Sequence, residues 1–334
     1  MKIVCLSEIA IPPAIMESMK ELEQFGAEVV ILEDPSIQTP EAFTQAMIKI
    51  EQEGADAWPA DPAFVEAAKD ADILAVHVSP VNEEVLAAAK KLKYIAVLRS
   101  GIENVRQDIC EKRGIQIINA PGRSAPAVAD CTIALMLAEM KNIARGHKAL
   151  MDGKWVKQFT NFEYIHDLCN CTVGIIGAGM IGRKVIDRLR GFECNILVHD
   201  PFMSDEEIKR MGYTPVALEE LLRQADIVSL HLRQSEQTRH FIAKRELDLM
   251  KPTTMLVNTA RAGIVDENAL VEALRNKTIG GAALDVFSEE PLGANHPLLT
   301  LDNVTLTPHI AGTSADTCPN SVRIIKDKLM KILK

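Results

Sequence analysis

Four polar residues in the C-terminal third of the chain follow apolar segments that look like strands. They are Arg261 in VNTARAG, Asp285 and Glu290 in ALDVFSEEPL, and His309 in LTPHIAG. Histidine exchanges a proton near neutral pH, an adjacent carboxylate fixes its ring tautomer, and arginine holds anions through paired donors. Such a set can move a proton on an anionic substrate. Each residue taken singly can instead be a loop histidine or half of an ordinary ion pair.

A glycine-rich turn in the middle of the chain is typical of a dinucleotide site. VGIIGAGMIG places Gly177, Gly179 and Gly182 as G-x-G-x-x-G between an apolar run and a predicted helix. The first glycine permits a tight turn, the second lets a pyrophosphate approach, and the third allows close packing of helix on strand. Asp200 ends the next predicted strand, where a carboxylate binds ribose hydroxyls and repels a 2′-phosphate. The pattern predicts NAD rather than NADP.

The composition is that of an ordinary folded protein. The chain has 334 residues, 47% hydrophobic and 25% charged, with a net charge of −9. No basic stripe is present, which disfavours a nucleic-acid or membrane surface, and no apolar run is long enough for a membrane helix. The seven cysteines are scattered and the N-terminal segment is not a signal peptide, so we expect a reducing cytoplasm. Cys169 and Cys171 lack a second ligand pair, so we expect free thiols and no metal.

Strand-like and helix-like segments alternate along the chain, which predicts parallel sheets with helices on both faces. We expect one long helix over 124–146, after which the pattern restarts. Asp266 is a candidate N-cap for a helix over 266–276. The other predicted helices include 14–24, 82–91, 180–190, 217–224 and 314–332. The predicted strands are 2–6, 28–32, 72–78, 94–98 and 115–118, then 172–177, 194–200, 226–232, 254–259 and 280–286.

Several motifs together resemble the D-isomer-specific 2-hydroxyacid dehydrogenase family. They are GAGMIG followed by HDP, then NTARAGIVDENAL, GAALDVFSEEPL and TPHIAG, and they occur in the family's order. The resemblance covers nearly the whole chain and implies two doubly wound α/β domains. A Rossmann NAD domain, expected over 119–311, would be inserted into a discontinuous flavodoxin-like substrate domain, expected over 1–118 plus 312–334.

The same resemblance implies a role for each residue of the site. His309 would be the base in oxidation and the acid in reduction, with Glu290 as its carboxylate partner. Arg261 would hold the substrate carboxylate and the oxygen that gains charge. Asp285 matches a position near the nicotinamide. The expected cofactor-binding residues are Gly177, Gly179, Met180, Ile181, Gly182, Asp200, His231, Thr259, Ala260, Arg261, Asp285, His309 and Gly312.

The loop after the predicted strand 94–98 is expected to bind the substrate together with Arg261 and His309. The family uses backbone N–H groups of this loop to hold the substrate carboxylate, and Ser100 and Gly101 match those positions. Arg99 is less expected there. It can bind a second anionic group, such as a phosphate, or it can form a structural ion pair.

Two further expectations concern assembly and size. GKWVK resembles a stretch that takes part in dimer contacts in the family, which implies a homodimer, whereas the plain alternative for Trp155 is packing within the chain. Many phosphoglycerate dehydrogenases carry an additional regulatory domain after the matched region. We expect none here, because only residues 313–334 follow Gly312.

The resulting hypothesis is an NAD-dependent enzyme that moves a hydride between C2 of a D-2-hydroxy acid and nicotinamide. 3-Phosphoglycerate or a related sugar acid is the first candidate substrate. Glu290 argues against a formate dehydrogenase, whose site resembles one with glutamine there. A phosphite-type dehydrogenase stays open, and so does a non-enzymatic NAD(H)-sensing corepressor on the same scaffold, which can retain all three residues.

Overall fold

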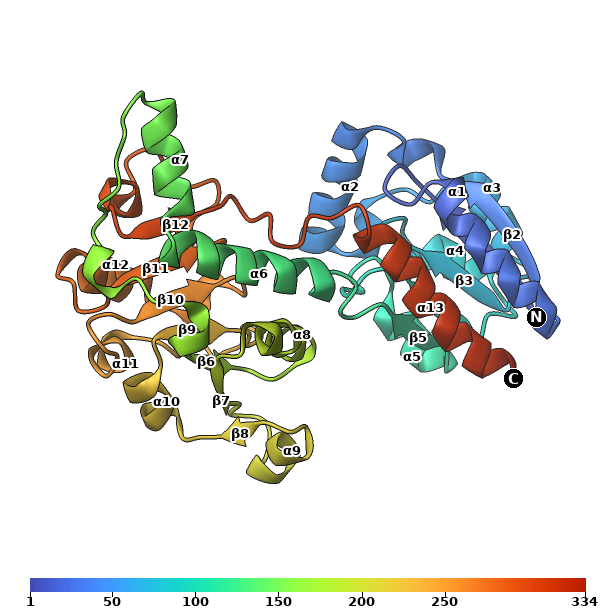
Figure 1. The fold of residues 1–334 in the computed structure, drawn as a ribbon. Coiled ribbons are helices and arrows are strands. Elements are labelled where there is room, and N and C mark those ends of the chain that lie inside the picture. The colour runs from blue at the N-terminus through green and yellow to red at the C-terminus, as the bar shows by residue number, and fades with distance from the viewer. The chain divides into compact units, whose positions relative to one another are not determined.

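The structure is a computed structural model that describes all 334 residues, and these divide into two compact units (Figure 1). Unit 1 contains Met1–Ser124 and Ser314–Lys334, and unit 2 contains Ala125–Thr313. Unit 2 is thus an insertion in unit 1. The chain passes from unit 1 to unit 2 after Ser124 and returns after Thr313. Both points lie a few residues after the domain boundaries expected from the sequence, at 118 and 311.

Unit 1 is built on a parallel five-stranded sheet in the order β2-β1-β3-β4-β5, which is the flavodoxin-like order. Val4 and Leu6 pack toward α3, α4 and α5, whereas Ile3 and Cys5 pack toward α1, η1 and the C-terminal helix α13. The strands are β1 (Lys2–Ser7), β2 (Glu28–Glu33), β3 (Ile73–Val76), β4 (Tyr94–Val97) and β5 (Gln116–Asn119). The helices are α1 (Pro13–Met16), η1 (Glu17–Phe25), η2 (Pro35–Ile37), α2 (Pro40–Glu53), η3 (Ala55–Ala57), α3 (Pro62–Ala68), α4 (Glu83–Ala88), α5 (Gln107–Arg113) and α13 (Thr317–Leu333).

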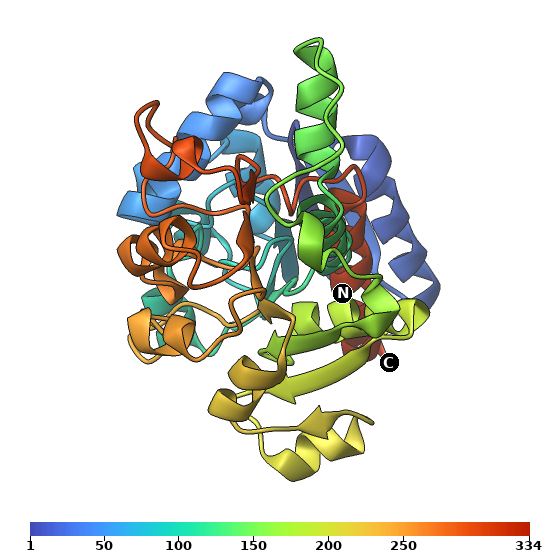
Figure 2. The same ribbon diagram turned by 60° about the vertical axis from the view of Figure 1, so that its left-hand side comes forward.

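Unit 2 is built on a parallel seven-stranded sheet in the order β12-β11-β10-β9-β6-β7-β8 (Figure 2). Helices α6 and α8 pack on one face, and α10, α11 and α12 pack on the other. The strands are β6 (Thr172–Ile176), β7 (Asn195–His199), β8 (Thr214–Pro215), β9 (Ile227–Leu230), β10 (Met255–Asn258), β11 (Gly281–Leu284) and β12 (Val304–Leu306). The helices are α6 (Ala125–Met140), α7 (Ile143–Met151), η4 (Phe162–Tyr164), η5 (Leu168–Asn170), α8 (Met180–Leu189), η6 (Arg190–Phe192), α9 (Asp205–Arg210), α10 (Leu218–Gln224), α11 (Lys244–Asp248), η7 (Ala262–Ile264), α12 (Glu267–Arg275) and η8 (Pro297–Thr300).

The prediction of two doubly wound parallel sheets is confirmed. So is the N-cap of α12, because the Asp266 side chain accepts a hydrogen bond from the N–H of Ala269 at 3.1 Å. The short helices α3, α5, α9 and α11 were not predicted, since segments of five to seven residues are too short to display a helical period.

The single long helix expected over 124–146 is wrong. The chain breaks between α6 and α7 at Asn142, whose φ of 58° lies in the left-handed region. Asparagine tolerates this conformation better than most residues. Its Oδ1 accepts from Arg145 of α7, and its Nδ2 donates to Oδ1 of Asn161, whose own Nδ2 donates to the carbonyl of Met140 at the end of α6. The segment over 14–24 also differs: it is one short α-turn followed by the 3₁₀ helix η1.

Candidate active site

The glycine turn lies between β6 and α8, at the C-terminal edge of the unit 2 sheet. Gly177 has a φ of 97°, and a Cβ there would lie 2.8 Å from the backbone of His231. A Cβ on Gly182 would collide with the carbonyl oxygen of Gly177. Gly179 is the N-cap of α8, and a Cβ there would meet no atom within 4 Å. The open space above this helix N-terminus fits the pyrophosphate of a dinucleotide.

Asp200 joins the glycine turn to the end of β7. Its Oδ2 accepts from the N–H of Ala178 at 2.7 Å, and its Oδ1 accepts from the N–H of Phe202 at 2.8 Å. Each carboxylate oxygen keeps a further acceptor site, so the same group can also bind ribose hydroxyls. The geometry is therefore compatible with the role expected from the sequence.

The remaining cofactor candidates of unit 2 follow the other strands at the same sheet edge. His231 follows β9, Thr259 and Ala260 follow β10, and Gly312 follows β12. The strand order reverses at β6, which pairs with β9 on one side and β7 on the other, and such switch points bind ligands in open α/β sheets. Burial lowers the pKa of His231 to about 3, so its ring is neutral beside the turn.

One open pocket of unit 2 is lined by Arg261, Glu290 and His309 together. Nδ1 of His309 lies 2.8 Å from Oε2 of Glu290, and both side chains are partly exposed. Oε1 of Glu290 accepts from the N–H of Phe287 at 3.0 Å. Burial acts to raise the pKa of Glu290, but the hydrogen bonds from His309 and Phe287 and the charges of His309 and Arg261 outweigh it and lower that pKa.

Asp285 holds the turn that carries His309. Its Oδ1 accepts from the hydroxyl of Thr307 at 2.6 Å and from the N–H of Ile310 at 2.9 Å, while Oδ2 accepts from the N–H of Ala311 at 2.8 Å. His309 itself has a φ of 53°, a conformation that a side-chain-bearing residue rarely adopts. The buried carboxylate of Asp285 thus stabilises a turn with an uncommon backbone conformation. The sequence analysis, which expected Asp285 only near the nicotinamide, did not predict this structural role.

Asn258 is a site residue that the sequence analysis did not single out. Its Nδ2 donates to the carbonyl of Arg261 at 3.0 Å, and its Oδ1 accepts from the N–H of Ala260 at 3.0 Å. It thereby shapes the loop that presents Arg261. The available signal was its place at the end of an apolar strand, two residues before Ala260. The neighbouring Thr259 is held by Thr132 of α6, with 2.7 Å between the two hydroxyl oxygens.

The substrate candidates Arg99, Ser100 and Gly101 lie in unit 1, after β4. Arg99 is buried and ion-paired with Glu51 of α2 and with Glu103, whose Oε2 lies 3.6 Å from its Nη2. Ser100 is exposed, and its carbonyl accepts from Nδ2 of Asn119 at 2.6 Å. The structure therefore shows the ion-paired alternative for Arg99.

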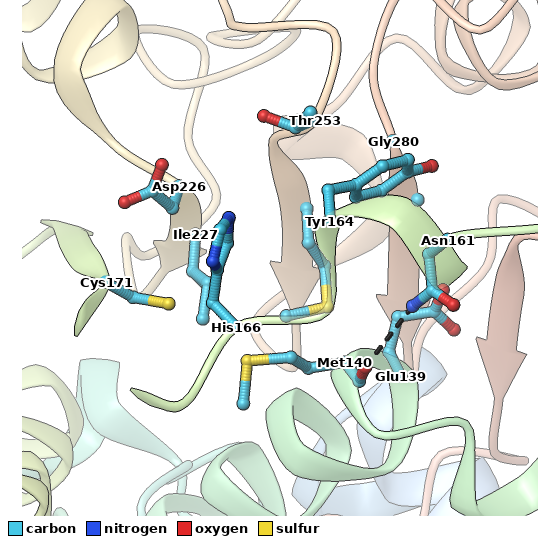
Figure 3. Close-up of a pocket in the computed structure, with 12 residues that line it drawn as sticks. Glu139, Met140, Asn161, Tyr164, His166, Cys171, Asp226, Ile227, Thr253 and Gly280 are labelled. Atoms are coloured by element: carbon cyan, nitrogen blue, oxygen red, sulfur yellow. Dashed lines mark hydrogen bonds between the residues drawn. The ribbon is translucent and has the colours of Figure 1, made fainter. Parts of the chain in front are cut away.

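A different pocket of unit 2 lies at the opposite sheet edge (Figure 3). Its lining includes Cys171 before β6, Asp226 before β9, Thr253 before β10, and Gly280 before β11. These are the N-terminal ends of the strands, whereas the glycine turn and the His309 turn follow C-terminal ends. This pocket is therefore separate from the candidate active site.

No group of three or more His, Cys, Asp and Glu side chains is placed to hold a metal ion. None of the helices combines the length and the apolar character that crossing a membrane requires.

Comparison with known sequences assigns the chain to a family. The family described as D-isomer specific 2-hydroxyacid dehydrogenase, NAD binding domain, matches residues 133–311. A D-3-phosphoglycerate dehydrogenase of Methanocaldococcus jannaschii is 39% identical over 274 residues, which are 81% of this chain and 51% of the relative. A glyoxylate reductase of Korarchaeum cryptofilum is 36% identical over 277 residues, which are 82% of this chain and 83% of the relative. The chain thus spans about half the length of the first relative and most of the second.

Solved structures share the fold. A glyoxylate reductase of Paecilomyes thermophila has a TM-score of 0.68 at 28% identity, covering 100% of this chain and 95% of that one. A D-isomer specific 2-hydroxyacid dehydrogenase of Lactobacillus delbrueckii in its NAD complexed form has a TM-score of 0.76 at 23% identity, covering 99% and 97%. The predicted cofactor, NAD, and the predicted Rossmann domain are confirmed. The chain belongs to the D-isomer specific 2-hydroxyacid dehydrogenase family, and its unit 2 contains that family's NAD-binding domain.

Proposed function

We propose that the protein is an NAD-dependent oxidoreductase that interconverts a D-2-hydroxy acid and its 2-oxo acid. The observation that carries this proposal is the pocket in which Arg261, Glu290 and His309 meet, with Nδ1 of His309 2.8 Å from Oε2 of Glu290. NAD(H), when bound, supplies or accepts the hydride at C2. The names of the relatives, dehydrogenases and reductases of 2-oxo and 2-hydroxy acids, agree with this reading.

His309 handles the proton. The Glu290 carboxylate accepts a hydrogen bond from Nδ1–H of the ring, which leaves Nε2 to face the substrate oxygen. In reduction Nε2–H protonates the oxygen as C2 receives the hydride, and in oxidation Nε2 removes the hydroxyl proton. The ionised Glu290, whose pKa is lowered, stabilises the charged imidazolium that oxidation produces.

Arg261 binds the negatively charged groups of the substrate. Its Nη1 donates to the carbonyl of Ala260 at 2.7 Å, which leaves other donors of the guanidinium for a ligand. A carboxylate or a carbonyl oxygen that gains negative charge matches those donors.

We propose that Ser100 and Gly101 of unit 1 hold the substrate carboxylate through backbone N–H groups. We propose that residues 119–311 form the NAD domain and the remainder the substrate domain.

Residues of the glycine turn would hold the cofactor. The N-terminus of α8 with Gly179, Met180 and Ile181 fits the pyrophosphate, and the Asp200 carboxylate fits the ribose. Met180 is 56% exposed, so it stands free to cover a bound ligand. His231, Thr259, Ala260, Asp285 and Gly312 are proposed to complete the site at the same sheet edge.

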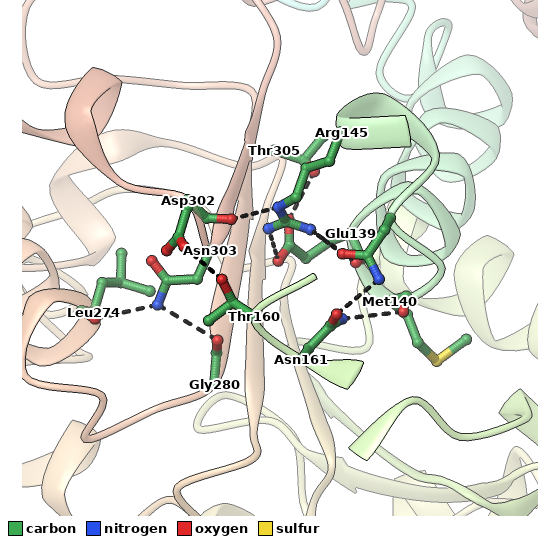
Figure 4. A network of polar contacts seen from close by, with 11 residues as sticks. Glu139, Met140, Arg145, Thr160, Asn161, Leu274, Gly280, Asp302, Asn303 and Thr305 are labelled. Carbon is green, nitrogen blue, oxygen red and sulfur yellow. Dashed lines mark hydrogen bonds and ion pairs between the residues drawn. The ribbon is translucent and has the colours of Figure 1, made fainter. Parts of the chain in front are cut away.

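We also propose a homodimer formed through the segment 143–162. It projects from the body of unit 2 in both ribbon views and exposes Ile143, Leu150, Met151, Trp155, Val156 and Phe162 (Figures 1 and 2). Trp155 is 80% exposed, so packing within the chain does not account for it. A polar network anchors the segment (Figure 4): Arg145 of α7 donates to the buried Glu139 of α6 and to the carbonyl of Asp302. Light scattering should show a dimer that Trp155→Ser weakens.

The decisive experiment measures NADH oxidation with pyruvate, glyoxylate, hydroxypyruvate, 2-oxoglutarate and 3-phosphohydroxypyruvate. We expect turnover of at least one acid with NADH, much weaker turnover with NADPH, and loss of turnover in His309→Asn. His296→Asn is the matched control, because His296 also contacts a glutamate, Glu267, at 3.2 Å but lies outside the pocket. If the protein binds NADH but reduces none of these acids, the proposal is wrong. Phosphite oxidation or NAD(H) sensing would then be the better hypothesis.

A further inference from the structure

The pocket that contains Arg261, Glu290 and His309 is also lined by a second arginine, Arg239. Arg239 belongs to the loop between β9 and α11, is exposed, and makes neither a hydrogen bond nor an ion pair through its side chain. The side chain of Arg261 donates only to the carbonyl of Ala260. Two arginines without an acidic partner thus line one pocket, and all the residues that line it belong to unit 2.

A backbone hydrogen bond brings the segments of the two arginines together. The N–H of His240 donates to the carbonyl of Gly263 at 2.8 Å. Arg239 is the residue before His240, and Arg261 is two residues before Gly263, so the two arginines lie on adjoining segments. Because both long side chains line the same pocket, one small ligand can contact both guanidinium groups.

The loop that carries Arg239 is fixed by a buried threonine. Oγ1 of Thr238 donates to the carbonyl of Arg233 at 2.7 Å and accepts from the N–H of Ser235 at 2.8 Å. Arg233 is exposed and free of ion pairs like Arg239, but it does not line the pocket. The loop therefore holds one arginine at the pocket and a second, comparable arginine outside it.

The charges that line the pocket favour an anion. Two carboxylates are present, of which Glu290 is engaged by His309 and only Glu236 has no partner. The guanidinium groups of Arg239 and Arg261 outnumber that one free carboxylate. Guanidinium groups bind carboxylates and phosphates through paired donors, so each arginine can hold one anionic group.

We propose that Arg239 binds a second negatively charged group of the substrate, a carboxylate or a phosphate, so that the protein prefers 2-oxo acids with two anionic groups. This inference rests on the proposed function, in which Arg261 binds the first carboxylate. Arg99, which the sequence suggested for a second anion, is already ion-paired with Glu51 and Glu103. Arg239 is then the residue that determines specificity for the charged tail.

The test compares kcat/KM with NADH for singly and doubly charged 2-oxo acids. Glyoxylate and pyruvate carry one anionic group, oxaloacetate and 2-oxoglutarate carry two carboxylates, and 3-phosphohydroxypyruvate carries a carboxylate and a phosphate. We expect at least about tenfold preference for the best doubly charged acid, since hydrogen bonds between charged groups are the strong ones. Whether that acid is a dicarboxylate or the phosphorylated acid identifies the second group.

Arg239→Gln should lower kcat/KM for the preferred doubly charged acid at least about tenfold and for pyruvate less than about twofold. Arg233→Gln is the matched control and should change neither. Glu236→Gln removes the free carboxylate of the pocket, so it should raise kcat/KM for the doubly charged acid. Fluorescence titration with NADH checks that each variant is folded and still binds the cofactor.

Preference of the natural protein for a singly charged acid would overturn the inference while leaving the proposed function intact. So would an equal loss on every acid in Arg239→Gln, or the same selective loss in Arg233→Gln. No turnover of any acid would overturn both the inference and the proposed function.

Discussion

The two units each place a histidine against a glutamate at the C-terminal edge of a parallel sheet, yet only one pair is suited to proton transfer. In unit 2, His309 and Glu290 are 46% and 38% exposed, and Nε2 of His309 is left for a substrate. In unit 1, Nδ1 of His77 lies 2.6 Å from Oε1 of Glu8, the two side chains are 3% and 0% exposed, and Arg123 already donates to Nε2 of the ring. The chemical pair is the same, and its surroundings decide what it does.

The difference teaches that contact distance alone does not identify a catalytic histidine. Burial lowers the pKa of His77, and although Glu8 opposes this effect, Arg123 and Arg99 reinforce it. A ring that stays neutral and is bonded at both nitrogens can orient a carboxylate but cannot shuttle a proton. We therefore expect substitutions of the two pairs to have different consequences.

The largest expected contrast is between His309→Asn and His77→Asn. Removing the proton donor in His309→Asn should lower kcat/KM for 2-oxo acid reduction by about 10²–10⁴-fold while NADH binding is retained. His77→Asn should lower it far less, because it disturbs only the orientation of Glu8. Steady-state kinetics with fluorescence titration of NADH measures both. Equal losses in two folded variants would remove the distinction between the pairs.

Glu290→Gln should have the next largest effect, a fall in kcat of about 10–100-fold. The amide stabilises the protonated ring less than the carboxylate does, so the alkaline fall of the reduction rate should move to lower pH. A pH–rate profile between pH 5 and 9 measures this shift. An unchanged profile would mean that Glu290 only positions the ring.

Asp285→Asn should weaken both activity and stability. The amide replaces an oxygen that accepts from a backbone N–H by a donor, so the His309 turn loses at least one of its three hydrogen bonds. We expect an unfolding free energy lower by about 1–3 kcal/mol and a lower kcat. Asp266→Asn is the control, because asparagine caps a helix about as well as aspartate. If both variants unfold alike in urea, Asp285 does not hold the turn.

The smallest expected effect is on the pH dependence of stability. The folded pKa of His77 is lowered, so the unfolded state binds the proton more readily; the stabilisation is present above about pH 6.5 and is lost as the pH falls below it. Burial lowers the pKa of His231 to about 3, which acts in the same direction, but His231 is present in both His77→Asn and His309→Asn and does not affect the difference between them. Urea unfolding at pH 7.5 and 5 should show a smaller difference in His77→Asn than in His309→Asn. A larger difference between the two pH values in His77→Asn than in His309→Asn would show that the burial of His77 does not make stability depend on pH.

Local sequence determined the features that depend on neighbours along the chain. The spacing of Gly177, Gly179 and Gly182 specifies a turn because only glycine permits that backbone and that close packing. Asp266 caps α12 because its side chain reaches an N–H three residues away. The apolar runs predicted the strands, and their ends located Arg261, Glu290 and His309.

The tertiary structure decided what lies next to what across the chain. Glu8 and His77 are 69 residues apart, and Asp285 is 25 residues from Ile310, so these contacts exist only because particular strands are neighbours in a sheet. Strand order is set by the packing of the whole core, which no local pattern encodes. The break at Asn142 likewise depends on Asn161 and Arg145. Burial of one histidine pair and exposure of the other follow from the same packing, and so do the different effects expected of their substitution.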